Sequence, residues 1–423
     1  MISRDRIVDR LTKYFMDTLP TLLLKPGEAD RLLAGHPWVY QGTQLRLTHP
    51  AADGSLVQVK DHRQRLLGTG FINSKSKIFV RLLSRDRIEP DVAFFEQRIR
   101  AALEVRARYM PGATSYRLIN AESDFLSGLI VDKYEDVLVL QASSLGMDQR
   151  KAVIVEALNR VMAPRAILER SDAGSRKFEG MEEAKGLLSG HYNFVPGARQ
   201  RIRLNQLQME VDLAGGHKTG LYLDQQVNYR EVGRLMNHGQ VLDCFSFAGG
   251  FALHAAAAGA DHVHGLDQSA DAVAVAAGNA ALNGLTSKCS FEPVNVFDWL
   301  KAETTVRPNE RLLPRFDGII LDPPSFTRNR ASIPDALRGY KEIHLRALKL
   351  LKPGGLLATF CCSHHVDANM FMNVILDAAF DARRLLRRVA VFGQSPDHPV
   401  IPSIPETEYL KGFAFEVVGQ ADL

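Results

Sequence analysis

At residues 242–251 the chain reads LDCFSFAGGF, an apolar segment that runs into a turn with two adjacent glycines, Gly249 and Gly250. Glycines let the backbone come close to a ligand where a strand gives way to a helix. The next β-type segment ends in Asp267, whose carboxylate suits the ribose hydroxyls of a nucleoside cofactor. The dinucleotide fingerprint needs a third glycine, which is absent here, so NAD is the less favoured ligand. A tight structural turn without a ligand is the alternative reading.

Strand-like and helix-like segments alternate around this turn, from about residue 206 onward. The strand candidates are Val241–Phe245, His262–Asp267, Cys289–Val294, Gly318–Leu321 and Leu356–Phe360, with a further β segment at Tyr409–Val418. The helical stretches between them include Ser269–Leu282, Pro334–Leu350 and Ala368–Phe380. This alternation predicts an α/β domain with a mainly parallel sheet covered on both faces. Such sheets bind ligands at the carboxyl ends of their strands.

Two more strand ends carry acidic residues. Asp298 follows the third strand, where its carboxylate suits either an adenine amino group or the start of a helix. The fourth strand runs into the motif Asp322-Pro323-Pro324-Ser325-Phe326. Its two prolines fix the backbone and remove two donors, which leaves the Asp322 carboxylate facing the cleft. The motif is typical of methyltransferases that act on nucleic-acid bases, and we expect Phe326 to stack on the target base.

The fifth strand ends in two adjacent cysteines, Cys361 and Cys362. A thiol beside a cofactor cleft is a candidate nucleophile, whereas a buried lone cysteine is usually inert. Successive strand residues point to opposite faces, so only one of the two can face the cleft, and we favour Cys362. A metal site that adds His364 and His365 is disfavoured, because contiguous ligands cannot surround one tetrahedral ion.

Length and composition place these motifs in a larger chain. The 423 residues predict about three domains. Short β-type segments separated by glycine and proline predict a small barrel or sandwich, and mixed strands and helices follow it. We place the boundaries at 1–19 for an N-terminal extension, 20–92 for the barrel, 93–205 for a central domain and 206–423 for the parallel sheet. The four cysteines form no disulfide framework, and no apolar run is long enough for a membrane span, so we expect a cytoplasmic protein.

Positive charge is concentrated near the N-terminus. Residues 1–110 hold 19 lysines and arginines against 12 aspartates and glutamates. The densest part runs from Lys60 to Arg87, where eight basic residues accompany only Asp61 and Asp86. This cluster predicts either a surface that binds a polyanion such as RNA or a solvated face without a partner.

Taken together, the motifs resemble the RlmI-type family of S-adenosylmethionine-dependent methyltransferases, which form 5-methylcytosine in large-subunit (23S) ribosomal RNA. The resemblance covers nearly all of the chain from about residue 22. It includes two segments like the family's PUA domain, a small RNA-binding barrel, at Gly35–Tyr40 and Gly68–Leu83, and a central-domain segment at Arg117–Tyr134. The chain departs from the family pattern at Ser127, where Pro is more usual, at Gln226, where Arg is common, and at Cys361, where Ser is more usual.

The resemblance implies a Rossmann-like class I methyltransferase domain preceded by a PUA barrel and a central α+β domain. It implies S-adenosyl-L-methionine as cofactor and ribosomal RNA as substrate, with no metal and no membrane; the oligomeric state stays open, a homodimer included. Cys362 and Asp322 take the catalytic roles. The residues that it assigns to the cofactor are Thr219, Gly220, Asp224, Gln225, Phe245, Ser246, Gly249, Gly250, Asp267, Asp298 and Asp322. Those that it assigns to the substrate are Pro323, Pro324, Phe326 and Lys411.

The expected mechanism starts from the chemistry of cytosine. Carbon 5 is a poor nucleophile until a thiolate, here that of Cys362, adds to carbon 6 and breaks the ring conjugation. A protonated or hydrogen-bonding Asp322 would stabilise the charge that develops at nitrogen 3. Two alternatives stay open at this point. The Asp-Pro-Pro motif also serves methyltransferases that modify a base nitrogen without a thiol, and an RNA-binding assembly factor could retain a cofactor cleft that no longer works.

Overall fold

The computed structural model describes residues 19–172, 174–193, 198–215, 220–307, 312–327 and 329–418. The chain divides into two compact units. The first unit consists of Met1–Ala198, Asp212–Gly220 and Pro396–Thr407, and the second of Arg199–Val211, Leu221–Ser395 and Glu408–Leu423. The four-part division that we derived from the sequence stays a prediction. Within the described residues, no helix is both long and apolar enough to cross a membrane.

The predicted parallel sheet forms the centre of the second unit, which confirms the expected fold class. Its strand order is β16-β15-β14-β17-β18-β20-β19, with β20 antiparallel to both neighbours and the first five strands parallel. Cys244 pairs with Leu321 and Leu321 with Thr359, so the carboxyl ends of β14, β17 and β18 lie side by side. The strands are β14 (Gln240–Cys244), β15 (His262–Asp267), β16 (Cys289–Pro293), β17 (Phe316–Leu321), β18 (Leu351–Cys361), β19 (Leu385–Phe392) and β20 (Lys411–Val418).

The sequence did not predict β19, because its Arg387-Arg388 pair interrupts the apolar run. The strand lies at the edge of the sheet, and its burial pattern shows that mainly alternate side chains are sheltered. An edge strand can carry charged residues that a central strand cannot, and charge there also discourages pairing with other chains.

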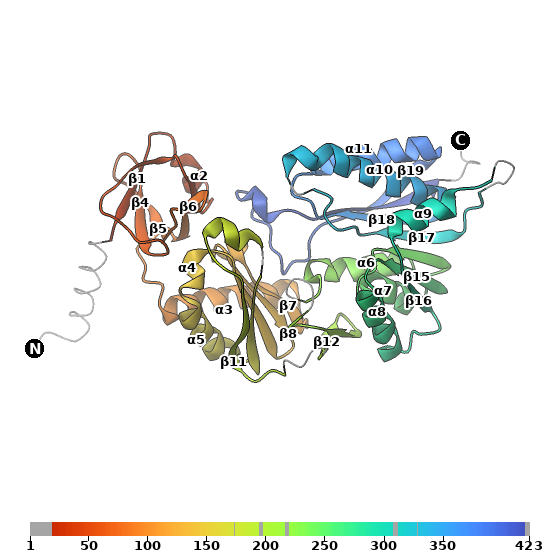
Figure 1. Ribbon diagram of the computed structural model, residues 1–423, viewed down its shortest axis with the longest axis horizontal. Coiled ribbons are helices and arrows are strands. Elements are labelled where there is room, and N and C mark those ends of the chain that lie inside the picture. The colour runs from red at the N-terminus through yellow and green to blue at the C-terminus, as the bar shows by residue number, and fades with distance from the viewer. Residues whose placement is uncertain are drawn as a thin grey trace, which may run out of the picture. The chain divides into compact units, whose positions relative to one another are not determined.

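Helices cover both faces of this sheet, as the alternating pattern predicts. Figure 1 shows α10 and α11 on one face and α6, α7 and α8 on the other. Side chains that accept hydrogen bonds from the first turn begin several helices: Ser269 caps α8, Asn295 caps α9 and Asp367 caps α11. The helices are α6 (Gln226–Leu235), α7 (Gly250–Ala258), α8 (Ala270–Leu282), α9 (Val296–Thr304), α10 (Ile333–Leu350) and α11 (Ala368–Ala382), and the hairpin β12 (Gln200–Leu204) with β13 (Leu207–Val211) belongs to the same unit.

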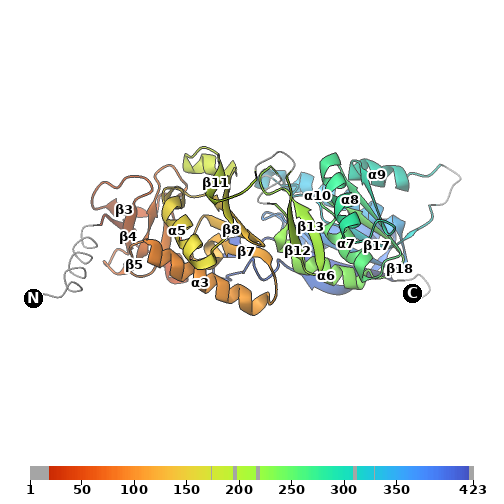
Figure 2. The ribbon, with the colours of Figure 1, turned by 90° about the horizontal axis from the view of Figure 1, so that it is seen from below.

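The first unit contains two further sheets. A six-stranded sheet has the order β2-β6-β5-β4-β1-β3, from β1 (Thr21–Leu24), β2 (Trp38–Tyr40), β3 (Gln44–Leu47), β4 (Leu56–Lys60), β5 (Leu66–Ile72) and β6 (Ile78–Ser84), with the short helix α2 (Asp30–Leu33). A five-stranded sheet has the order β11-β10-β9-β8-β7, from β7 (Ser115–Asn120), β8 (Leu129–Tyr134), β9 (Val137–Ala142), β10 (Ala166–Ser171) and β11 (Ala184–Gly190). Helices α3 (Val92–Tyr109) and α5 (Lys151–Met162) lie side by side and pack Ile99 and Leu158 into the same core; α4 (Leu145–Asp148) precedes α5 (Figures 1 and 2).

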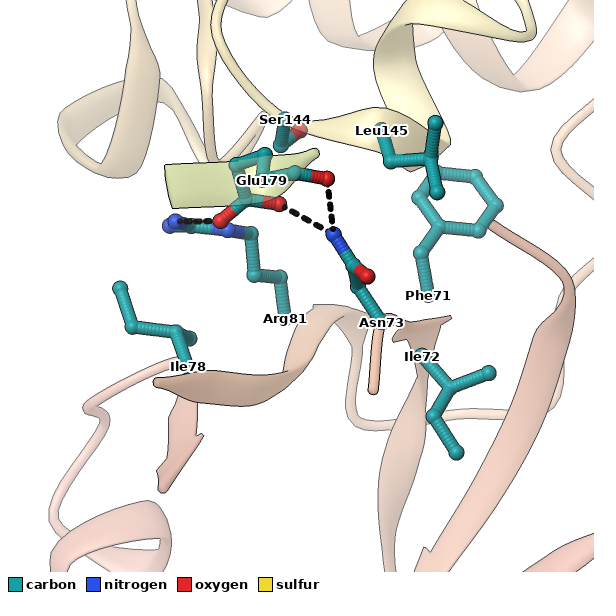
Figure 3. Close-up of a pocket in the computed structure, with 9 residues that line it drawn as sticks. Phe71, Ile72, Asn73, Ile78, Arg81, Ser144, Leu145 and Glu179 are labelled. Carbon is teal, nitrogen blue, oxygen red and sulfur yellow. Dashed lines mark hydrogen bonds and ion pairs between the residues drawn. The ribbon is translucent and has the colours of Figure 1, made fainter. Parts of the chain in front are cut away.

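A buried polar cluster joins the six-stranded sheet to the 3-10 helix Gly174–Glu179, which lies between β10 and β11 in the sequence. The Glu179 carboxylate accepts hydrogen bonds from Asn73 Nδ2 at 2.9 Å, Ser76 Oγ at 2.5 Å and Arg81 at 2.9 Å, and Figure 3 shows Asn73 and Arg81 pointing toward it. The cavity beside this cluster has a volume of about 10 Å³, which is the space of roughly one water molecule. The cavity is therefore far too small for a cofactor, and we interpret the polar cluster as a structural contact.

The segment Pro396–Thr407 is tied to the first unit by a buried ion pair and its neighbours. The Arg106 guanidinium binds both oxygens of Asp124 at 2.5 and 2.7 Å and also donates to the Asp397 carbonyl at 2.8 Å. Asp397 in turn accepts from the backbone N–H of Arg117 through Oδ2. These bonds satisfy charges that would be costly to bury unpaired. They fix the Asp397-His398-Pro399 segment within this unit.

Candidate active site

The turn after β14 has an unusual backbone. Phe245 and Phe247 adopt φ values of 66° and 47°, and Gly249 has φ 86° immediately before α7 begins at Gly250. Left-handed backbone is unfavourable for residues with a side chain and is retained where neighbouring contacts enforce it, often at functional sites. Here the Phe247 N–H donates to Asp267 Oδ2 at 2.9 Å. The turn and the end of β15 therefore hold each other in place.

Asp243 is a buried carboxylate beneath this turn, and sequence reasoning gave it no role. Its Oδ2 accepts from Ser246 Oγ at 2.9 Å and from the Ala252 N–H at 3.0 Å. Its Oδ1 is buried without a hydrogen-bond partner in the described part of the chain. Burial raises the pKa of Asp243 to about 7, although both hydrogen bonds favour the ionised form. A carboxylate inside an apolar strand was the sequence signal that could have revealed it.

The two predicted nucleoside-binding carboxylates differ in setting. Asp267 is half-buried at the end of β15, and it accepts from the backbone N–H groups of Phe247 and Ser269. Asp298 is exposed in the first turn of α9. The residue that caps α9 is Asn295, whose side chain accepts from Phe297 and Asp298. The alternative reading of Asp298 as a helix cap is therefore wrong.

Gly250 has a steric role in the same region. A Cβ atom at this position would lie 2.6 Å from the ring of Tyr229, which is closer than carbon atoms can approach. Tyr229 is itself buried and packs edge-on against Phe251. Glycine is required at 250 because α6 and α7 approach each other closely here, a reason separate from any contact with a ligand.

Asp322 lies directly after β17 and is half-buried. Gln225 Nε2 donates to its Oδ1 at 3.0 Å, and the Asp322 N–H points to the carbonyl of Cys244 at 3.4 Å. The neighbouring Asp224 accepts from Tyr409 Oη at 2.6 Å, while its Oδ1 is buried and lacks a donor within the described residues. Contacts between residues that are distant in the sequence thus bring the side chains of Asp224, Gln225 and Asp322 together at the carboxyl ends of the strands.

Tyr222 belongs to this group; it lies in the segment that the family resemblance places against the cofactor, but it was not among the residues assigned to the site. Burial is the main reason that its pKa is raised, and the negative charges of Asp322 and of the Cys362 thiolate raise it further. The Tyr222 phenol therefore stays protonated and lies close enough to both predicted catalytic residues to feel their charges. Its ring contacts Phe247 of the turn edge-on, with the centroids 5.2 Å apart.

The two adjacent cysteines have different surroundings. Cys361, the last residue of β18, is fully buried, and its Sγ lies 3.3 Å from Tyr340 Oη of α10. Cys362 is half-buried, and its Sγ lies 4.0 Å from the carbonyl oxygen of Pro323. The Cys362 sulfur therefore lies beside the Asp-Pro-Pro turn at the end of the neighbouring strand.

The predicted substrate residues lie around this turn. Lys411 Nζ donates to the Ser363 carbonyl at 2.5 Å, and burial lowers the pKa of Lys411 while the charges of Cys361 and Cys362 oppose that shift. Phe326 is half-buried, and its ring centroid lies 4.7 Å from that of Tyr340 and 5.6 Å from that of Phe297. Pro323 is buried and Pro324 is exposed.

Of the predicted cofactor residues, one lies outside the described residues and one belongs to the other unit. Thr219 lies outside the described residues. Gly220 belongs to the first unit, where it has φ 144° and where a Cβ would lie 2.8 Å from Tyr134 Oη. The remaining predicted cofactor residues, Asp224, Gln225, Phe245, Ser246, Gly249, Gly250, Asp267, Asp298 and Asp322, all belong to the second unit.

The chemistry of this edge fits S-adenosylmethionine. That molecule presents a sulfonium and an ammonium cation together with ribose hydroxyl and adenine amino donors, all of which need acceptors. Asp224 and Asp243 each offer a buried carboxylate oxygen that lacks a donor in the described chain, and Asp267 lies at the adjoining strand end. Among the described residues, no group of three or more His, Cys, Asp or Glu side chains has metal-binding geometry.

Comparisons with known proteins identify the family. Residues 188–405 match the family of S-adenosylmethionine-dependent methyltransferases, and residues 22–85 match the PUA-like domain. The chain is 40% identical to the ribosomal RNA large subunit methyltransferase I of Salmonella arizonae over 412 residues, covering 96% of this chain and 100% of the relative. The chain belongs to the ribosomal RNA large subunit methyltransferase I family. S-adenosylmethionine is its cofactor, and the six-stranded sheet at its N-terminal end is a PUA-like domain.

Other relatives agree with this assignment. The large subunit methyltransferase I of Klebsiella pneumoniae strain 342 is 40% identical over 403 residues, covering 94% of this methyltransferase and 98% of the relative. Among solved structures, a protein from Streptococcus mutans described as a candidate S-adenosylmethionine-dependent methyltransferase superposes with a TM-score of 0.78 at 21% identity, covering 94% and 100% of the two chains. A second structure with the same TM-score, at 22% identity, is described as complexed with SAH. At this identity the likeness establishes the fold alone.

Proposed function

We propose that this methyltransferase forms 5-methylcytosine in large-subunit ribosomal RNA, with Cys362 as the nucleophile. The observation that carries the proposal is the position of a half-buried thiol 4.0 Å from the Asp-Pro-Pro turn. A methyltransferase that modifies a base nitrogen needs the turn but not the thiol. The names of the relatives supply the class of RNA. A cytoplasmic location, where ribosomal RNA is found, follows from the same proposal.

The chain's residues would act in sequence on a cytosine that has left its stack. The Cys362 thiolate adds to carbon 6, so a carbon–sulfur bond forms while the C5–C6 double bond opens and its electrons move toward nitrogen 3. Asp322 stabilises that charge by hydrogen bonding or by giving nitrogen 3 a proton. The bound cofactor supplies an electrophilic methyl group on a sulfonium. As carbon 5 takes the methyl, the methyl–sulfur bond would break and its electron pair would stay on sulfur. A base then removes the carbon 5 proton, the C5–C6 double bond re-forms, Cys362 leaves as the thiolate, and nitrogen 3 returns any proton it received to Asp322.

The other assigned side chains would bind the cofactor or orient the target nucleotide. We propose that the cofactor is held by residues of three kinds: the polar side chains Asp224, Gln225, Asp267 and Asp298; the turn residues Phe245, Ser246, Gly249 and Gly250; and the segment with Thr219 and Gly220. The buried Asp243 joins them because its Oδ1 lacks a donor in the described chain. Pro323, Pro324, Phe326 and Lys411 are proposed to contact the target nucleotide. Phe326 packs against Phe297 and Tyr340, so it would present a preformed aromatic edge to a base.

The PUA-like domain would contribute phosphate contacts. Within the cluster from Lys60 to Arg87, the exposed basic side chains are Arg63, Arg65, Lys75, Lys77, Arg85 and Arg87. Arg81 is different, because it lies in the buried polar cluster with ion pairs to Glu122 and Glu179. Removing the two exposed lysines should weaken RNA binding and flatten its dependence on salt, since each phosphate contact releases about one counterion.

The test is nucleoside mass spectrometry after incubation with labelled S-adenosylmethionine. The substrate is ribosomal RNA from cells that lack this gene. The proposal requires label in 5-methylcytosine. Label in a nitrogen-methylated base would contradict the proposal and support the reaction that needs no thiol. A protein that neither binds the cofactor nor transfers label would be an RNA-binding factor only.

A further inference from the structure

Asn228 is a buried polar residue that neither the family resemblance nor the proposed mechanism uses. It lies in the first turn of α6 and is only 3% exposed. Its Nδ2 donates to the Gly393 carbonyl at 2.8 Å and to Gln225 Oε1 at 2.7 Å. Gln225 is 2% exposed, and its Nε2 donates to Asp322 Oδ1 at 3.0 Å. A continuous chain of hydrogen bonds therefore runs from the backbone after β19 to Asp322 at the end of β17.

In this series of hydrogen bonds, the Gly393 carbonyl at one end fixes which atom is the donor in every bond. The oxygen and nitrogen of a side-chain amide occupy nearly the same space, so an amide can usually turn over and exchange them. A backbone carbonyl, however, can only accept, so the Asn228 nitrogen must face Gly393. The same nitrogen then requires an oxygen from Gln225. The Gln225 nitrogen is left with only one direction, toward Asp322.

We propose that Asn228 is a positioning residue for methyl transfer, which fixes the Gln225 amide so that Oδ1 of Asp322 is always a hydrogen-bond acceptor. A proton that Asp322 carries must then sit on Oδ2. Because the proton that stabilises nitrogen 3 of the target base has to come from a defined atom, this arrangement presents it in one orientation. The inference rests on the proposed role of Asp322, and its test separates the two.

The substitution Asn228→Asp reverses the polarity with almost no change of shape. The introduced carboxylate cannot donate to Gly393 or to Gln225, so the Gln225 amide turns over and directs Oε1 at Asp322. Two acceptors then face each other, and Asp322 becomes protonated at a higher pH than before. The substitution adds one carboxylate, at position 228, whose negative charge favours protonation of Asp322 as well. The titratable groups already present stay in place: the phenols of Tyr222, Tyr229 and Tyr340, which feel the charge of Asp322, and the Cys362 thiol and Asp224 carboxylate, which act on the same phenols.

The experiment measures single-turnover methyl transfer to RNA as a function of pH, from about pH 6 to 9, in the full-length protein. Asn228→Asp should lower the rate at neutral pH by about tenfold, because the Asp322 proton then lies on Oδ1, between the two acceptors, and is not directed at the base. It should also move one limb of the profile to higher pH, because Asp322 is protonated at a higher pH. The matched control is Asn283→Asp. Asn283 Nδ2 likewise donates two hydrogen bonds, here to the backbone carbonyls of Gln208 and Asn279, and no series of hydrogen bonds among the described residues links it to Asp322. The control should leave the profile in place.

A second variant covers the case in which Asn228→Asp does not fold. Gln225→Glu keeps the acceptor for Asn228 and places a carboxylate against Asp322, so the same limb should move in the same direction. Profiles that coincide with the wild type in shape, at whatever amplitude, would overturn the role of Asn228. Wild-type protein that forms a methylated nucleoside other than 5-methylcytosine would instead overturn the proposed function, and the comparison of pH profiles would still apply.

Discussion

Cys361 and Cys362 are adjacent in the chain, yet their sulfur atoms face different surroundings. Cys361 Sγ lies 3.3 Å from Tyr340 Oη among the core side chains of α10, whereas Cys362 Sγ lies 4.0 Å from the Pro323 carbonyl. The alternation of a strand sends successive side chains to opposite faces. One thiol is consequently part of the core, and the other lies at the strand end where the Asp-Pro-Pro turn begins.

The first prediction concerns these two thiols. Cys362→Ala should retain S-adenosylmethionine binding and lose 5-methylcytosine formation, because nothing else would add to carbon 6. Cys361→Ala should keep methyl transfer and lose about 1 kcal/mol of stability or somewhat more, since it opens a small cavity. Calorimetry of cofactor binding and mass spectrometry of the RNA product check both. Full activity of Cys362→Ala would end the covalent route.

The second prediction concerns Lys411. Its Nζ is held by the Ser363 carbonyl, one residue beyond Cys362. The charges of Lys411 and of the Cys362 thiolate attract each other, so Lys411 favours the thiolate form of that cysteine. Lys411→Met should therefore slow alkylation of Cys362 at neutral pH severalfold, while Lys411→Arg, which keeps the charge, should slow it much less. Cys362 is half-buried and Cys244, Cys289 and Cys361 are buried, so brief alkylation followed by peptide mapping reports on one site. Equal rates in all three proteins would contradict this role.

The third prediction concerns pH and Asp243. Its pKa rises from 3.8 to about 7, mainly through burial, so the folded state binds this proton more tightly than the unfolded state. Stability from this group is therefore present in full below about pH 4 and is lost as the pH rises from there through 7. Asp243→Asn should flatten that part of the profile, because the amide cannot ionise. Urea denaturation of both proteins without cofactor, at pH values across this range, measures the free energy of unfolding. If the two proteins showed parallel dependences of this free energy on pH, Asp243 would not titrate in the range.

The fourth prediction compares two ion pairs of the first unit. Arg106 and Asp124 are buried, so Arg106→Met leaves an unpaired carboxylate inside and should cost about 3–5 kcal/mol. Arg160 pairs with Glu156 at the surface, and Arg160→Met should cost less than about 1 kcal/mol. Chemical denaturation gives both values. Similar losses in the two variants would mean that the Arg106 pair is no stronger than a surface pair.

The sequence alone determined the architecture of the methyltransferase domain. Alternation of strand and helix periods predicts the parallel sheet, because the period of apolar residues decides which element forms and the sheet must be covered on both faces. The same reasoning places Asp267, Asp322 and Cys362 at strand ends. Those positions follow from local pattern, so no knowledge of distant contacts was required.

Only the tertiary structure decided which side chains meet. Asp224 and Tyr409 are 185 residues apart and share a hydrogen bond, and Gln225 is held against Asp322 by Asn228 and the Gly393 carbonyl. Such contacts depend on the order of strands in the sheet and on close packing between elements, which local pattern does not encode. The buried Oδ1 of Asp243 is likewise a property of the folded structure, because the donors of the turn and of α7, Ser246 Oγ and the Ala252 N–H, both reach the other oxygen, Oδ2.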